Sequence, residues 1–310
     1  MSESTTPPAI EMANIYKAFP GVKALNDVSF SCAAGEVHAL VGENGAGKST
    51  LIKILSGVYR PDAGAILING RQVAFKHPVE ALRAGISVIY QEFSLLPERT
   101  VAQNIFLGRE PRRRGIIDTA AMRLETRRVL DVFGTGARIE PDTLVVDLDV
   151  ASQQMVEIAK AISLDAKVVV MDEPTAALNE QECEILFGII DKLRARGTAI
   201  IYITHRMREV TRLATRVTVL KDGEVAARFD ALPRPEAIIH AMVGRDIADY
   251  YPPPATPGEI GDMVLSVKGA GNALLPDVSF ELRAGEIVGF AGRARRARHG
   301  AVRFAAVHQR

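Results

Sequence analysis

Cysteine and tryptophan are scarce in this sequence. Its 310 residues include two cysteines, Cys32 and Cys183, and no tryptophan. The cysteines lie far apart, without the short spacing of a metal or redox motif, and two alone do not make the disulfide framework of a small secreted domain. We therefore interpret both as reduced packing residues and expect no redox or cysteine-ligated metal chemistry.

Long hydrophobic runs and an excess of either charge are also missing. No apolar stretch reaches the roughly 18 residues of a transmembrane helix, and the polar start MSESTTPPAI lacks the basic and apolar parts of a secretory leader. The net charge of +1 gives no general attraction to nucleic acid, so we expect no specific nucleic-acid partner. Because 47% of the residues are hydrophobic, the chain can bury a core. The composition predicts a folded cytoplasmic protein.

The most informative stretch is GENGAGKST, which fits the phosphate-binding pattern GxxxxGK[ST]. It follows a predicted apolar strand, Val37 to Val41, and leads into a predicted helix that stops at Gly57. In this context backbone N–H groups and the helix N-terminus surround a phosphate. The alternative is an ordinary glycine-rich turn, which the strand-loop-helix context makes less attractive. We predict that Lys48 contacts the β- and γ-phosphates of a nucleotide and that the Ser49 hydroxyl binds Mg²⁺. The predicted nucleotide-binding residues of this stretch are Gly42, Glu43, Asn44, Gly45, Ala46, Gly47, Lys48, Ser49 and Thr50.

Two acidic residues follow a second apolar strand, Val168 to Met171. Asp172 and Glu173 stand at its carboxyl end, where open α/β sheets bind their ligands. We predict that Asp172 binds the same Mg²⁺ and that Glu173 acts as the general base or orients water. The alternative is an ordinary pair of loop carboxylates, which the upstream phosphate loop makes less attractive.

Two further residues are assigned by their places relative to this loop. His205 ends the predicted strand Thr198 to Ile203, and we expect it to contact the γ-phosphate, although a lone histidine there is often structural. Phe19 precedes the phosphate loop and is a candidate for stacking on adenine, with a packing role as the alternative.

The chain divides into segments of different character. Residues 1–9 form a polar tail, residues 10–245 a nucleotide-binding domain that opens with an antiparallel β edge, and residues 95–165 a helical subdomain inserted into it. In that insertion Thr100 and Gln103 have capping-box spacing, one helix ends at Gly108, a second begins after Asp118, and Ser152 is expected to cap a third. The basic run at residues 112–114 is interpreted as a solvated loop, with a phosphate or RNA contact as the alternative.

Beyond a proline-rich linker at residues 246–259, the chain repeats itself. The sequences DVSF and AGE recur at an offset of 250 residues, so residues 260–292 resemble the start of a second copy of the domain. Where a second phosphate loop is due after Gly292, residues 293–310 contain six arginines and no acidic residue. We expect this tail to be disordered and interpret the abrupt switch as translation in a shifted frame, which makes the second domain truncated.

Together GENGAGKST, Gln91 after SVIY, VVVMDEPT and His205 in YITHR resemble the ATP-binding subunits of ABC transporters. The surrounding sequences KAFPGVKALNDVSF, QQMVEIAKAIS and HAMVGR are similar to the tandem-domain ATPases of bacterial monosaccharide importers, the ribose, galactose, arabinose and xylose group. The resemblance covers about residues 10 to 292. It implies an α/β P-loop NTPase fold: an ABC-type nucleotide-binding domain with a parallel core sheet, an antiparallel β edge and an inserted helical subdomain.

The resemblance also implies roles and partners. Gln91 would sense Mg²⁺ and the γ-phosphate, and Phe19 would stack on adenine. The helical subdomain would couple to membrane permease subunits, and through the permease to a periplasmic sugar-binding protein. A second nucleotide-binding domain would complete each ATP site in trans, and the subunit would lie on the inner face of the cell membrane.

Two positions depart from the family pattern. Leu148-Asp149-Val150-Ala151-Ser152 stands where the family has LSGGQ, so Asp149 would place a carboxylate near phosphate and Ala151 replaces a glycine. Asn179 stands where many relatives have an aspartate. The preferred interpretation is an ATP-hydrolysing subunit of a sugar importer. The alternatives are a nucleotide-binding remnant without turnover and an ABC-type ATPase of DNA repair or translation. The lack of a long heptad tract argues against the repair relatives.

Overall fold

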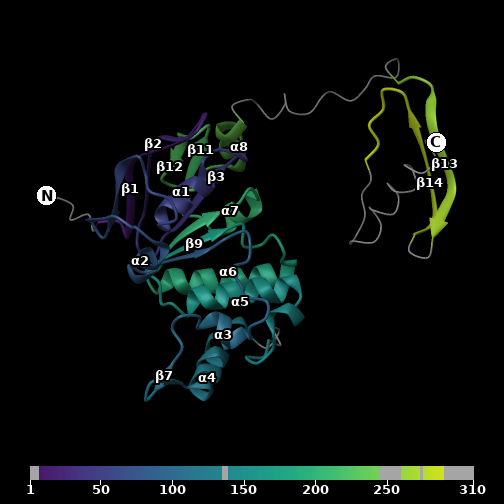
Figure 1. Cartoon of the computed structure of the whole chain (residues 1–310). Coiled ribbons are helices and arrows are strands. Elements are labelled where there is room, and N and C mark those ends of the chain that lie inside the picture. The colour runs from purple at the N-terminus through teal and green to yellow at the C-terminus, as the bar shows by residue number, and fades with distance from the viewer. Residues whose placement is uncertain (1–6, 135–138, 244–259, 273–274, 290–310) are drawn as a thin grey trace. The chain divides into compact units, whose positions relative to one another are not determined.

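The computed structural model of the protein describes residues 7–134, 139–243, 260–272 and 275–289 (Figure 1). The chain divides into two units, Met1–Asp246 and Ile247–Arg310. Among the described residues, no helix combines the length and the apolar character needed to span a bilayer. The proline-rich linker at residues 246–259 and the arginine-rich residues 293–310 lie outside the described ranges.

The centre of the first unit is a six-stranded sheet with the strand order β12-β11-β3-β10-β9-β6. Five of its strands are parallel, and β12 pairs antiparallel with β11. The strands are β3 (Val37–Gly42), β6 (Ile86–Ile89), β9 (Val168–Asp172), β10 (Ala199–Ile203), β11 (Arg216–Lys221) and β12 (Glu224–Phe229). Every residue of β3 and β10 is buried, as expected for parallel strands covered on both faces. The predicted parallel core sheet is confirmed.

A second, antiparallel sheet has the strand order β2-β1-β4-β5. Its strands are β1 (Ile10–Phe19), β2 (Val22–Cys32), β4 (Ala63–Ile68) and β5 (Arg71–Val73). Asn69 and Gly70 both have positive φ and turn β4 into β5, as an Asn-Gly hairpin turn requires. The predicted antiparallel edge is therefore a sheet of its own.

Helices cover both faces of the central sheet. They are α1 (Lys48–Leu55), α2 (Pro78–Arg83), α3 (Val101–Ile105), α4 (Thr119–Leu130), α5 (Val150–Ile162), α6 (Glu180–Ala195), α7 (Met207–Leu213) and α8 (Pro235–Val243), with 3₁₀ turns at Asp131–Phe133 and Val145–Asp147. Alternate residues of β9 serve different cores because successive strand side chains point to opposite faces. Val168 and Val170 pack with α1 and the antiparallel sheet, whereas Val169 and Met171 pack with α5 and α6. Helix α1 is thus held between the two sheets.

The helical region contains α3, α4, α5 and the short hairpin of β7 (Arg112–Arg113) and β8 (Ile116–Ile117). Figure 1 shows α3 and α4 at the end of this unit that is remote from the antiparallel sheet. The predicted capping box of Thr100 and Gln103 is confirmed, although α3 ends at Ile105, before Gly108. The basic run lies on the exposed hairpin. The prediction that Ser152 caps α5 is wrong: Asp149 is the cap, and its side chain accepts a hydrogen bond from the Ser152 backbone N–H.

The described part of the second unit is a two-stranded antiparallel hairpin. It consists of β13 (Met263–Asn272) and β14 (Leu275–Arg283), and Val267 pairs with Phe280. This hairpin contains the repeated DVSF sequence and has the same antiparallel pairing as β1 with β2 in the first unit.

Candidate functional site

A cleft of about 1010 Å³ opens at the carboxyl ends of β3, β9 and β10. Parallel strands end together at this edge of a sheet, so residues from distant parts of the chain meet there. Its lining brings together nearly all the residues predicted for the site: Phe19, Gly42, Glu43, Asn44, Gly45, Gly47, Lys48, Ser49, Thr50, Gln91, Asp172, Glu173 and His205. Val22, Ala24 and Met242 also line the cleft and were not predicted.

Ala46 is the exception among the predicted loop residues. Ala46 is 4% exposed, and it belongs to the hydrophobic core that also contains the buried residues of α1. Its carbonyl accepts a hydrogen bond from the Gly223 N–H, so its backbone fastens the loop to the turn between β11 and β12. Ala46 therefore supports the loop from below and does not line the cleft.

The phosphate loop runs from β3 into α1 and passes very close to other backbone. A Cβ on Gly42 would lie 2.3 Å from the Leu220 carbonyl oxygen, and one on Gly47 would lie 2.7 Å from that of Ala24. Gly47 also has φ of 102°, a region that L side chains rarely adopt. These two positions therefore require glycine.

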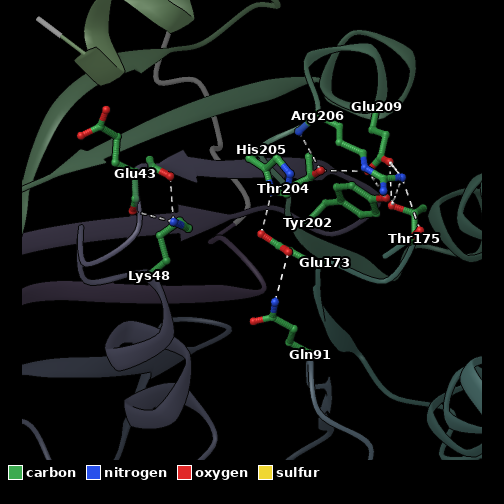
Figure 2. A network of polar contacts seen from close by, with 11 residues as sticks. Glu43, Lys48, Gln91, Glu173, Thr175, Tyr202, Thr204, His205, Arg206 and Glu209 are labelled. Carbon is green, nitrogen blue, oxygen red and sulfur yellow. Dashed lines mark hydrogen bonds and ion pairs between the residues drawn. The ribbon is translucent and has the colours of Figure 1, made fainter. Parts of the chain in front are cut away.

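Lys48 begins α1 and reaches back across the loop. Its ammonium donates hydrogen bonds to the carbonyl oxygens of Gly42 at 2.8 Å and Glu43 at 2.9 Å (Figure 2). Burial lowers the pKa of Lys48, and the charges of Asp172 and Glu173 act in the opposite direction. A cation that is partly desolvated and held by neutral carbonyls is well placed to bind an anion.

Glu173 lies at the centre of a second set of contacts (Figure 2). His205 Nδ1 lies 2.8 Å from its Oε1, and the Gln91 amide nitrogen donates to its Oε2 at 3.3 Å. Because an ionised carboxylate only accepts hydrogen bonds, the His205 contact requires a proton on Nδ1. The structure thus joins the three predicted catalytic residues, which come from the segments that follow β9, β6 and β10.

Asp172 is half-buried, and its surroundings act on the negative charge of its carboxylate in opposite directions. Burial raises its pKa, the charge of Glu173 raises it further, and Lys48 and Lys53 lower it. Such a carboxylate gains from a cation. Ser49 and Gln91 bring further oxygen atoms to the same cleft, and this donor set fits Mg²⁺. No group of three or more His, Cys, Asp or Glu residues that could hold a metal occurs in the described ranges.

Phe19 lines the cleft, but its ring is half-buried. It packs edge-on against Tyr59 with centroids 5.3 Å apart, and the Lys17 ammonium lies 5.6 Å from its centroid. The sequence left stacking and packing open for this residue. The structure shows the packing contact, and stacking on adenine stays a prediction.

The segment from Leu148 to Ser152 does not line the cleft. Asp149 accepts a hydrogen bond from the Ser152 N–H at 2.8 Å, and this bond lowers the pKa of its carboxyl group. Its negative charge therefore serves the N-terminus of α5, where carboxylates are favourable.

Comparisons with known proteins agree with this geometry. Residues 25–176 match the ABC transporter family model. The chain is 51% identical over 286 residues to a ribose import ATP-binding protein of Rubrobacter xylanophilus, covering 92% of this chain and 56% of that protein. It is 45% identical over 288 residues to an arabinose import ATP-binding protein of Mannheimia succiniciproducens, covering 92% and 57%. The chain thus spans little more than half the length of these relatives.

Solved structures give the same answer for the fold. A nucleotide-free ATP-binding cassette from an ABC transporter matches with a TM-score of 0.65 and 26% identity, over 77% of this chain and 96% of that one. An ATP-binding cassette in its ADP conformation matches equally well, over 77% of this chain and all of that one. The predicted P-loop NTPase fold of the ABC type is confirmed, and the chain belongs to the ABC transporter family of ATP-binding proteins.

Proposed function

We propose that this chain binds Mg·ATP in the cleft and hydrolyses it to energise sugar import, as the cytoplasmic ATP-binding subunit of an ABC transporter. One observation carries the proposal. A phosphate loop with its lysine, a half-buried aspartate and the linked group of Gln91, Glu173 and His205 all line the same cleft. A site for phosphate, a site for a divalent cation and a candidate general base are thereby combined.

The chemistry follows from these positions. The Lys48 ammonium and the loop N–H groups bind the β- and γ-phosphates, and Ser49, Gln91 and Asp172 would hold Mg²⁺, which neutralises charge that develops on the phosphates. Glu173 accepts a proton from a water whose oxygen bonds to the γ-phosphorus, while the bond from that phosphorus to the bridging oxygen of ADP breaks. His205 and Gln91 hold the Glu173 carboxylate and lie where they can contact the γ-phosphate.

The partners come from the relatives, whose names give ribose, galactose or arabinose import. We infer that the chain works with membrane permease subunits at the inner face of the membrane, and through them with a periplasmic sugar-binding protein. A second nucleotide-binding domain would complete the ATP site in trans. A second cavity of about 300 Å³, between α2, β6 and the helical region, supports a docking role because exposed Val79, Leu82 and Leu107 line it.

A second candidate function is nucleotide binding without turnover. Asp149 and Ala151 in the segment that corresponds to the family signature favour it. Single-turnover phosphate release, with the chain in excess over ATP, separates the two candidates: release supports hydrolysis, and bound but intact ATP supports the second.

The nucleotide site itself is tested with Lys48→Ala. We expect the parent chain to bind Mg·ATP and the variant to lose binding at physiological concentrations, because the substitution removes the cation placed on the phosphates. Lys76→Ala is the control, since it removes the same charge at an exposed residue outside the cleft lining. Calorimetric titration with ATP measures both. Equal affinity of parent and Lys48→Ala would contradict the proposed site.

A further inference from the structure

Glu209 is a buried carboxylate that does not line the cleft. It lies in the first turn of α7 and is 5% exposed. Its Oε1 accepts a hydrogen bond from Thr175 Oγ1 at 2.6 Å, and its Oε2 accepts from the Tyr202 and Thr204 hydroxyl groups, each at 2.9 Å (Figure 2). Both carboxylate oxygens are therefore engaged by donors.

The donors come from both segments that carry residues of the site. Thr175 follows Glu173 by two residues on the loop after β9, whereas Thr204 directly precedes His205 at the end of β10. The Glu209 carboxylate is thus hydrogen-bonded both to the loop after β9 and to the segment after β10. Arg206 adds to the connection, because its Nη1 lies 3.4 Å from Glu209 Oε1 and donates to the Thr175 carbonyl oxygen at 3.3 Å.

The loop after β9 needs such support. Glu173 has φ of 48°, a conformation that is costly for a residue with a side chain and persists where neighbouring contacts enforce it. Its N–H donates to the Ile203 carbonyl at 2.9 Å, and its carbonyl accepts from the Ala176 N–H at 3.1 Å. These two bonds and the Thr175 hydroxyl define the path of the loop.

The hydrogen bonds to Glu209 are of the strong kind. A buried charge is costly unless it is paired and hydrogen-bonded, and bonds to an ionised group are stronger than neutral ones. Burial and the charge of Glu209 raise the pKa of Tyr202, so its hydroxyl remains a donor. Removing one hydroxyl group therefore weakens the connection between Glu209 and the segment that carries that hydroxyl, and leaves the other hydrogen bonds to Glu209 in place.

We propose that Glu209 is a positioning residue that fixes the loop of Glu173 relative to His205, and thereby the contacts of the cleft with the terminal phosphate. The second part rests on the proposed function, because it assumes that ATP occupies the cleft. The first part concerns the protein alone.

Two variants that each remove one hydroxyl from the same carboxylate give a matched test. Thr175→Val cuts the connection to the Glu173 loop and keeps the shape of the side chain. Tyr202→Phe removes an equally buried hydroxyl from within β10 and leaves both loops connected. Glu209→Gln serves as a third variant, which keeps the size of the side chain but removes its charge.

The first readout is amide hydrogen exchange of Glu173 and Ala176 in the full chain without nucleotide. We expect exchange about tenfold faster in Thr175→Val and Glu209→Gln, the scale of one lost hydrogen bond to a charged group, and near the parent rate in Tyr202→Phe. Equal exchange in Thr175→Val and Tyr202→Phe would show that Glu209 only stabilises the fold, and would overturn the proposal.

The second readout compares Mg·ATP with Mg·ADP affinity in the same variants. We expect Thr175→Val to weaken ATP binding about threefold to tenfold, because the contacts to the terminal phosphate are misplaced, and to leave ADP binding unchanged; Tyr202→Phe should change neither. Unchanged ATP affinity in Thr175→Val would overturn the link to phosphate contacts. A parent chain that binds neither nucleotide would contradict the proposed function, and the exchange rates alone would then decide the role of Glu209.

Discussion

At the scale of single residues, Glu173 combines a strained backbone conformation with a carboxylate that two neighbouring side chains contact. Its φ is 48°, and His205 and Gln91 contact its two carboxylate oxygens. Strained backbone conformations of this kind cluster at functional sites, where the surrounding structure enforces them. This argument supports a chemical role for Glu173.

The variant Glu173→Gln tests that role. We expect it to bind Mg·ATP but to slow any hydrolysis by about 10² or more, because the amide keeps the size of the side chain and cannot accept the proton from water. Single-turnover phosphate release measures the effect. Glu184→Gln, at an exposed position of α6, is the control that should behave like the parent. Equal release by Glu173→Gln and the parent would exclude Glu173 as the general base.

At the scale of elements, helix α5 depends on a cap that the sequence did not identify. Asp149→Ala should lower the free energy of unfolding by about 1 kcal/mol, the usual cost of a lost N-cap, whereas Asp149→Asn should retain most of it. The bond from the Ser152 N–H lowers the pKa of Asp149 below its ordinary 3.8. The negative charge of Asp149 therefore adds stability above about pH 3.8, and this contribution is lost as the pH falls through the lowered pKa. Denaturant unfolding of the three chains, at neutral pH and near pH 3, checks both statements.

Strands β2, β3 and β11 are joined by a buried histidine. His38 Nδ1 contacts the Ser31 carbonyl at 2.7 Å, and its Nε2 contacts Thr218 Oγ1 at 2.8 Å. The carbonyl only accepts, so Nδ1 carries the proton of a neutral ring. Burial, and then the charge of Arg216, lowers the pKa of His38 from 6.5 to about 4.

This histidine should make stability depend on pH. Between about pH 6.5 and 4 the unfolded chain binds a proton at His38 and the folded chain does not. The free energy of unfolding therefore decreases as the pH is lowered through that window, by about 3 kcal/mol in total. His38→Gln should remove this part of the slope. Glu36 beside it has a pKa raised by burial, which acts in the opposite direction, so the difference between parent and variant is the quantity to measure. Equal slopes would refute the assignment.

The sequence predicted the residues of the site better than the residues that hold them in place. The phosphate loop, Asp172, Glu173 and His205 were found because each lies in or directly after an apolar strand, which is a local pattern. The contact of Glu209 with Thr175 joins residues 34 positions apart, and α7 is too short to show a clear period. The cap of α5 was misplaced because Asp149 and Ser152 are both capping residues within one turn, and only backbone geometry distinguishes them. Met242 reaches the cleft from α8 through tertiary packing alone.

At the scale of the whole molecule, the two units differ in what the structure describes of them. The first unit contains a complete central sheet, its covering helices and the cleft, whereas the described residues of the second are a single hairpin. The relatives are nearly twice as long as the matched part of this chain. In the proposed function each ATP site pairs one phosphate loop with the signature segment of another domain, and the 310 residues contain one such loop.

We therefore expect the 310-residue polypeptide to bind ATP with little or no steady-state hydrolysis. A second copy could complete the site only by presenting Leu148 to Ser152, where the charge of Asp149 would face phosphate unfavourably. The measurement is phosphate release by this polypeptide beside a chimera whose residues 260–310 are replaced by the second domain of one of its longer relatives. The chimera should turn over ATP, and Glu173→Gln should reduce its rate. Comparable rates in the two proteins, both abolished by Glu173→Gln, would show that the cleft needs no second domain and that Asp149 does not impair a shared site.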